Sequence, residues 1–245
     1  MNEVIRQLHE RKSVRVFTDR PIDQDAATQI LMAAAMAPTA GNQQLYTVIR
    51  VTDPELKASL AESCDHQPFI AQSKLVLVFC ADCLKWYDAF CCAGCTPRKP
   101  GEGDLLLAVS DALIAAQNAV VAAHSLGIGS CYIGDIMENA EIHRKTLHLP
   151  DYVFPAAMLV FGYPTEKQLQ RQKPERVALQ HIVHDNAYRR MDEAELREMF
   201  ASRCGEKTYE EWMQAFCNRK YDSDFSREMT RSVREYLKQY AEILE

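Results

Sequence analysis

The chain has 245 residues, of which 47% are hydrophobic and 25% are charged, which are ordinary values for a globular protein. This length fits one large α/β domain or two small ones, with a substantial buried core. The formal net charge of -6 argues against a nucleic-acid-binding protein, which would normally carry a basic stripe. The first residues lack a signal-peptide pattern, and polar side chains interrupt the apolar stretch 105–126, so we expect a soluble, cytoplasmic protein. Its nine cysteines are then expected to be reduced thiols.

Hydrophobic periodicity, helix caps and turn residues predict an alternation of helices and strands. We expect strands at 46–51, 75–80 and 153–161, and one more within the Gly-rich segment 127–135. The run 75–80 is almost wholly apolar, which is typical of a central strand buried on both faces. The segment 83–103 is expected to be irregular. Helices are expected at 2–10, from Asp23 to about Ala37, at 54–62, 104–126 and 138–147, and from 192 onward, ending with 226–244.

The helix expected at 104–126 is apolar around nearly its whole circumference, which predicts burial on all sides. A monomer of this size rarely covers such a helix, so the pattern favours a packed dimer. The sequence shows no internal repeat and no low-complexity linker. We therefore expect a single domain over 1–245, with 186–245 as a helical C-terminal extension.

The stretch from Arg11 to Phe17 carries the most informative pattern. In an extended backbone Arg11, Ser13 and Arg15 would point to the same side, which forms a row of two guanidinium groups and a hydroxyl. Such a row suits the phosphate and sugar-like oxygens of an elongated cofactor. Taken alone, the stretch also fits a basic helix end followed by an edge strand. A second basic cluster, 171–176, could close on the same phosphate.

Three other features bear on ligand binding. Asn42, Gln44 and Gln67 offer paired donors and acceptors that suit the edge of a planar heterocycle, although turns use the same residues. The glycines of 127–135 would let a backbone approach a ligand closely. That segment is neither a Walker A loop nor a Rossmann fingerprint, because no Gly-Lys-Ser/Thr follows and a helix precedes it.

The cysteine pairs Cys80-x-x-Cys83 and Cys92-x-x-Cys95 have zinc-ribbon spacing. We expect no metal site, because Cys80 lies in an apolar, β-prone run and neither pair has a Gly-rich knuckle. The sequence contains no His-Glu-x-x-His motif and no Gly-x-Ser-x-Gly elbow, and no catalytic acid, base or nucleophile is assigned.

In their order along the chain, these features resemble the FMN-dependent nitroreductase family, particularly its NADPH-using flavin reductase and nitroreductase branch. The resemblance spans about 3–190. It implies an α+β, three-layer fold, with a mixed central sheet flanked by helices, and an intertwined homodimer that holds FMN at the subunit interface. It rests on Arg11-x-Ser13-x-Arg15, Ala37-Pro38-x-x-Gly41-Asn42-x-Gln44, Gln67, the Ala-rich helix, Leu126-Gly127-Ile128-Gly129 with Tyr132-Ile133-Gly134, and Gly162-Tyr163-Pro164 leading to Lys173 and Arg176.

The resemblance also implies a set of cofactor-binding residues. Residues 11–15 would hold the phosphate, the ribityl chain and the pyrimidine edge. The loop 39–44 would come from the partner chain, and residues 133–135 would face the flavin N5. The second basic cluster reads Lys-Pro-Glu-Arg where the family commonly reads Lys-Pro-Arg, so either of its cations could bond the phosphate. The implied residues are Arg11, Lys12, Ser13 and Arg15; Thr39, Ala40, Gly41, Asn42 and Gln44; Gln67; Tyr132, Ile133, Gly134 and Asp135; and Lys173 and Arg176.

The activity implied is hydride transfer from NAD(P)H through flavin N5 to nitroaromatic, quinone or flavin acceptors by a ping-pong mechanism, in which the flavin carries the chemistry. Arg15 would stabilise the negative charge of the reduced pyrimidine edge, and Arg203 is a candidate for the NADPH 2′-phosphate. Two alternatives stay open. One is a relative with another flavin reaction, such as reductive dehalogenation, and the other is a flavin or thiol redox sensor that uses Cys92 and Cys95.

Overall fold

The computed structural model describes residues 1–241 and divides into two compact units. One unit contains residues 1–171 together with the chain from Met229 onward, and the other contains Gln172–Glu228. The assignment of one domain with a helical extension from 186 stays a prediction. The last part of the helix expected at 226–244 lies outside the described residues.

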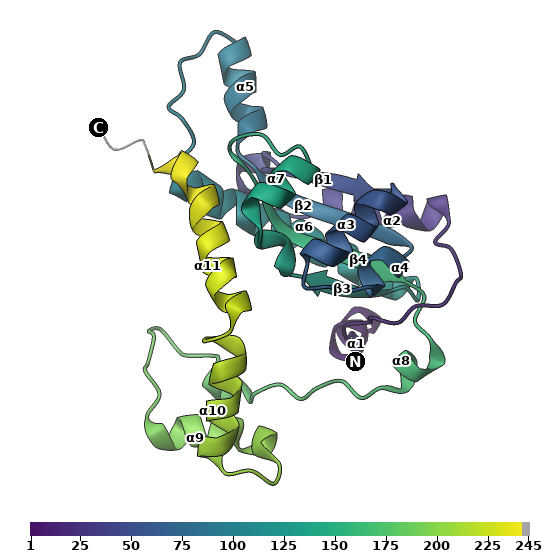
Figure 1. Cartoon of the computed structure of the whole chain (residues 1–245), viewed down its shortest axis with the longest axis vertical. Helices are drawn as coiled ribbons and strands as arrows, with labels where there is room; N and C mark the ends of the chain where they lie inside the picture. The colour runs from purple at the N-terminus through teal and green to yellow at the C-terminus, as the bar shows by residue number, and fades with distance from the viewer. Residues whose placement is uncertain (242–245) are drawn as a thin grey trace. The chain divides into compact units, whose positions relative to one another are not determined.

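The first unit is built on a four-stranded sheet (Figure 1). The strands are β1 (Tyr46–Val51), β2 (Leu75–Asp82), β3 (Gly129–Ile133) and β4 (Val153–Gly162), in the order β1-β2-β4-β3. Each neighbouring pair is antiparallel. The four strands thus form an antiparallel sheet where a mixed one was expected, and the parallel pairing is limited to an isolated bridge between Ser13 and Ser130 at the β3 edge.

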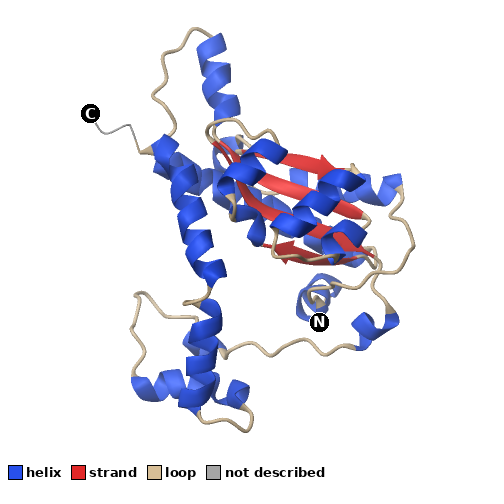
Figure 2. Cartoon of the chain, in the orientation of Figure 1, coloured by secondary structure: helices blue, strands red, loops and turns tan. Residues whose placement is uncertain are grey.

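Helices cover both faces of the sheet, which gives the expected three layers (Figure 2). On one face α6 packs on β2 and α2 packs on α6, in a cluster with Leu77 and Phe79, and on the other face α3 and α4 share a cluster with Val76 and Val78. The helical segments of this unit are α1 (Glu3–Glu10), α2 (Gln24–Ala35), η1 (Ala40–Asn42), α3 (Pro54–Ser63), α4 (Phe69–Gln72), α5 (Leu84–Cys92), α6 (Glu102–Ser125), η2 (Asp135–Met137), α7 (Ala140–Thr146), α8 (Glu166–Gln170), the later part of α11 (Asp224–Leu237) and η4 (Lys238–Tyr240).

Local signals in the sequence account for most of these elements. Asn2 and Asp23 cap α1 and α2, with their side-chain oxygens accepting from Ile5 N at 3.0 Å and Ala26 N at 2.7 Å. All residues of β2 are buried, as expected for a central strand. The expectation of an irregular segment at 83–103 is wrong, because that segment contains α5. This helix has no buried residue, so it lacks the apolar period that marks a packed helix.

Helix α6 is long and apolar enough to cross a membrane by length and composition. In this fold its alanine-rich side packs against the sheet and α2, as the core helix of a soluble domain does. Within one chain its expected burial on all sides does not hold, since Leu106 is 68% exposed and Leu107 and Ile114 also face outward. An apolar surface of this kind on a central helix is the surface that a second chain would cover.

The second unit contains η3 (Leu179–His181), α9 (Glu193–Cys204), α10 (Tyr209–Lys220) and the start of α11. Asp192 and Thr208 begin α9 and α10 with capping boxes, which explains why the sequence from 192 onward was expected to be helical. The two helices pack through stacked rings, with the centroids of Phe200 and Trp212 5.8 Å apart.

Candidate functional site

The stretch that carries Arg11, Ser13 and Arg15 is fixed to the edge of the sheet. Val14 N donates to Ser130 O at 2.9 Å, and the Val14 side chain is buried against β3. Gly129 leaves no room between the two segments, because a Cβ at that position would lie 2.7 Å from Val14 Cγ2. The close approach therefore requires glycine at 129 and sets where the cations lie.

The three polar side chains of this stretch converge on one thiol, that of Cys131 in β3. Burial raises the pKa of Cys131, and the Arg15 guanidinium, the Ser13 hydroxyl and the Arg11 guanidinium oppose that rise. All three side chains therefore lie near this thiol, and the expectation that they share one side of the segment stays a prediction.

Two of these cations have no acidic partner in the described part of the chain. Neither Arg11 nor Arg15 forms an ion pair there, and the Arg11 Nε is buried without a hydrogen-bond partner. A buried guanidinium nitrogen without a partner is costly, which points to an anionic ligand that completes it. A phosphate monoester, with its charge and its several acceptor oxygens, fits this requirement.

The other two cations next to this stretch have structural partners. Lys12 Nζ donates to Leu169 O at 2.7 Å and to Arg171 O, and the Arg171 guanidinium donates to Ser13 O. These bonds hold the segment after α8 against the row. A small cavity of about 100 Å³ lies beside this stretch, and its lining includes Lys12, Ser130 and Leu169. It is smaller than the roughly 300–1,000 Å³ of typical ligand pockets.

The turn after β3 brings a backbone to the surface at Gly134. A Cβ at this position would have only Met137 Cε within reach, at 4.0 Å, so the space above Gly134 is open to a ligand. Met137 N donates to Gly134 O at 3.0 Å and closes the turn. Ile133 is buried at the end of β3, and Asp135 begins η2. Tyr132 is partly buried, which raises the pKa of its phenol to about 12, and Arg11 opposes that rise.

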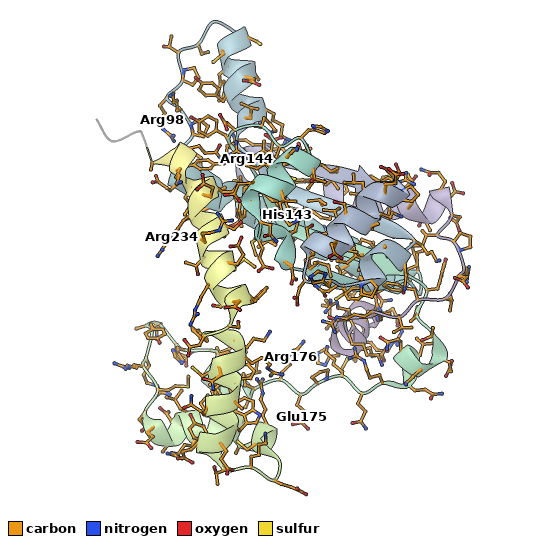
Figure 3. All side chains as sticks on the ribbon, viewed as in Figure 1. Arg98, His143, Arg144, Glu175, Arg176 and Arg234 are labelled. Atoms are coloured by element: carbon orange, nitrogen blue, oxygen red, sulfur yellow. The ribbon has the colours of Figure 1, made fainter. Side chains whose placement is uncertain are left out.

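The buried His143 of α7, labelled in Figure 3, contacts both this turn and the end of α3, before Gln67. One ring nitrogen, Nδ1, lies 2.9 Å from Ile136 O, and the other, Nε2, lies 2.9 Å from Ser63 Oγ. Gln67 follows a turn after Ser63 and donates its own Nε2 to Cys64 O at 2.8 Å. One imidazole thus links the turn that follows Gly134 to the end of α3, which precedes Gln67.

The loop that carries Thr39, Ala40, Gly41, Asn42 and Gln44 lies just before β1. Its partner in the fold is Asp111, a buried carboxylate on α6 that accepts from Ala40 N at 3.2 Å and from Leu45 N at 3.1 Å. The sequence reasoning treated Asp111 only as a polar interruption in an apolar helix. A single carboxylate inside an alanine-rich helix was the available signal.

The remaining candidates lie elsewhere. Lys173, Arg176 and Arg203 belong to the second unit, and the guanidinium of Arg203 lies 5.6 Å from the ring centroid of Phe200. Cys92 and Cys95 are exposed at the end of α5. The roles suggested for these five residues stay predictions.

Comparison with known proteins adds to this geometry. The model of the nitroreductase family matches residues 8–163. A Bacillus subtilis protein named as an NAD(P)H-dependent FMN reductase is 32% identical over 238 residues, which cover 96% of this chain and 91% of that protein. An oxygen-insensitive NADPH nitroreductase of Salmonella typhimurium is 33% identical over 195 residues, which cover 79% of this chain and 78% of that protein.

Solved structures agree with this match. The hypothetical oxidoreductase YcnD from Bacillus subtilis has a TM-score of 0.85 at 30% identity, and NfrA2 from Bacillus megaterium has a TM-score of 0.83 at 30% identity. Both alignments cover 100% of each chain. The cation row at the edge of this three-layer α+β fold has the charge and the donors that suit a phosphorylated ligand. The chain belongs to the nitroreductase family.

Proposed function

We propose that this chain is an FMN-dependent oxidoreductase that takes reducing equivalents from NAD(P)H. Relatives are named as an FMN reductase and a nitroreductase, and the two matches cover 96% and 79% of this chain. The observation that carries the proposal is the row of Arg11, Ser13 and Arg15, with two cations that lack acidic partners in the described structure. This row is suited to the phosphate end of FMN.

The residues present fit the cofactor in three places. Arg11 and Arg15 would bond the phosphate and the pyrimidine edge of the flavin, and Ser13 would bond the ribityl chain. The open backbone at Gly134 would lie against the ring system, and Gln67 would reach the ribityl chain or the flavin. Lys173 and Arg176 are proposed to add to the phosphate site.

When bound, FMN supplies the redox chemistry, by accepting a hydride from the reduced nicotinamide and passing electrons to an acceptor. The chain's own residues bind and orient the reactants and adjust the local charge. Arg15 would hold positive charge near the pyrimidine edge, where it favours the reduced form. We infer that nitroaromatics, quinones or free flavin serve as acceptors, and that reductant and acceptor use one site in turn.

We also infer that the working form is a homodimer in the cytoplasm. The exposed apolar side of α6 supports the dimer, because Leu106, Leu107 and Ile114 would otherwise remain in water. Val4, Ile5 and Leu8 of α1 are exposed as well. They are a second group of large apolar side chains that a partner chain could cover.

The absorption spectrum of the purified protein tests the proposal. We expect flavin bands that NADPH bleaches under anaerobic conditions and that a quinone or nitroaromatic acceptor restores. Initial rates at several acceptor concentrations should give parallel double-reciprocal lines if one site serves both reactants. A colourless protein that does not bind added FMN would contradict the proposal. Flavin binding that depends on thiol oxidation, without turnover, would instead support the sensor alternative.

A further inference from the structure

The loop between α2 and β1 has a backbone that the core of the protein does not require. Gly41, Asn42 and Gln44 all have left-handed φ values, of 57°, 57° and 50°, and all three are exposed. Gly and Asn adopt left-handed backbone readily, but it is unfavourable for Gln, and at Gln44 it persists because the surroundings impose it. Strained residues of this kind cluster at ligand sites.

Asp111 is the group that imposes this conformation. Its Oδ2 accepts from Leu45 N at 3.1 Å and from the Thr39 hydroxyl, and its Oδ1 accepts from Ala40 N at 3.2 Å. The Thr39 oxygen in turn accepts from Gln44 N at 2.7 Å. Both ends of the loop are therefore fastened to one carboxylate.

Other bonds support the loop only at single points. Trp86 Nε1 donates to Gln43 O at 2.8 Å, and the Gln44 side chain donates to Ala35 O at 3.1 Å. Asp111 is only 3% exposed, although its neighbours on the same side of α6 are alanines. A buried carboxylate is costly, whereas an apolar residue at that position would pack at no such cost. The carboxylate thus orders a surface loop and adds nothing to the hydrophobic core.

The loop and the cation row lie at diagonally opposite corners of the sheet. The loop precedes β1, and the row pairs with β3, at the other edge. Tyr46 pairs with Ala81 at one end of β2, whereas the Ser13–Ser130 bridge is level with Phe161 and Leu75 at the other end. The path from the loop to the row crosses four strand spacings, from β1 through β2, β4 and β3 to the row, and runs about six residues along β2. The two features therefore lie roughly 25 Å apart.

We propose that Asp111 is a positioning residue, which sets the shape of the 39–45 loop so that it completes the cofactor site of a second copy of the chain. This inference rests on the proposed function. Because the loop and the row lie so far apart in one chain, with the sheet between them, both can reach the same ligand only across a dimer. Asp111 then contributes to affinity without touching the cofactor.

Asp111→Asn is the direct test. The amide keeps one acceptor oxygen and replaces the other by a donor, which faces donors that the carboxylate had satisfied. We expect the Kd for FMN, measured by flavin fluorescence quenching, to rise about ten- to hundredfold, the range for a lost bond to a charged group. Asp104→Asn is the matched control, because Asp104 lies on the same helix but bonds Arg98 and Gly101 N.

Mixed dimers show whether the loop acts on the partner's site. One chain carries Arg15→Ala and a first tag, and the other carries Asp111→Asn and a second tag. The two chains are co-expressed, and dimers that contain both are purified through the two tags in succession. If the loop acts across the dimer, one site carries both changes and the other carries none. Half of the sites should then bind FMN with the wild-type Kd. If the loop acts within its own chain, each site carries one change and no wild-type site appears, which would overturn the proposal.

The remaining outcomes are also distinguishable. Thr39→Val keeps Asp111 and removes one bond, so it should raise the Kd in the same direction but by less. Should Asp111→Asn lower the thermal unfolding temperature while leaving the Kd for FMN unchanged, Asp111 is merely structural and the proposal is wrong. A wild-type protein that does not bind FMN contradicts the proposed function itself, before any variant is compared.

Discussion

Gly129→Ala tests whether the packing of one methyl group controls the cation row. The new Cβ would lie 2.7 Å from Val14 Cγ2 and 2.8 Å from Val14 Cβ. Carbon atoms prefer a separation of about 3.5–4.0 Å, so the segment with Arg15 must move outward by roughly 1 Å. That shift stretches the 2.9 Å bond from Val14 N to Ser130 O beyond hydrogen-bonding distance.

The expected loss combines two effects. Overpacking costs about 1–3 kcal/mol and the lost hydrogen bond about 1 kcal/mol, so the free energy of unfolding should fall by about 2–4 kcal/mol in urea titrations of the apoprotein. The displaced cations should also raise the Kd for FMN at least about tenfold, as expected when a charge-assisted bond is misplaced. Val14→Ala in the same chain removes the methyl groups at 2.7 and 3.1 Å and should restore part of both losses.

Gly103→Ala is the matched control, since a Cβ there meets nothing within 4 Å. It should leave FMN binding unchanged and the free energy of unfolding equal or slightly higher. If Gly129→Ala lowers stability but keeps the wild-type Kd for FMN, the row does not hold the cofactor. If it leaves stability unchanged as well, the packing argument itself fails.

Three further outcomes follow from buried groups. Burial lowers the pKa of His143 below its ordinary 6.5, so the unfolded chain binds more protons than the native protein does. The free energy of unfolding should therefore decrease as the pH is lowered below 6.5. His143→Gln should flatten that part of the pH profile. Ser232 Oγ accepts from Ala140 N at 2.9 Å and donates to Met137 O at 2.7 Å, so Ser232→Ala should cost about 2–4 kcal/mol in urea titrations, whereas the exposed Ser125→Ala should cost little. A thiol reagent should rapidly label the three exposed cysteines of the native protein, which are Cys91, Cys92 and Cys95. The four buried cysteines should react only on unfolding, and they are Cys64, Cys80, Cys83 and Cys131. Rapid labelling of a buried cysteine would contradict this prediction.

Local patterns predicted the elements of this fold well where the element carries its own signal. The cap at Asp23 and the apolar run from Leu75 gave a helix and a strand at nearly the observed positions. Helix α5 was missed because its stability does not depend on a buried stripe. Asp82 Oδ1 caps it by accepting from Leu84 N at 3.1 Å, and the sequence contains that cap only as an acidic residue at a strand end.

The parts of the candidate site have local signals in the sequence, whereas the contacts that support them do not. The alternation of Arg11, Ser13 and Arg15 is a property of any extended backbone, so three residues suffice for the prediction that they share a side. The supporting groups act over long distances in the chain instead. Asp111 bonds a hydroxyl 72 positions away, and His143 contacts a serine 80 positions away. No local period records such contacts, because they depend on how the sheet brings its neighbours together.

The position of the supporting polar groups suggests how such sites can be found from sequence. Asp111, His143 and Ser232 are all buried, and each bonds the backbone of a loop or turn. A buried polar group is unfavourable unless its partners are complete, so it persists where it orders a segment that apolar packing cannot hold. Loops at a ligand site are such segments, since they must keep their own polar groups available to the ligand. An acidic residue in the interior of a largely apolar helix is therefore a marker for the loop it fastens, and in this chain Asp111 leads to 39–45.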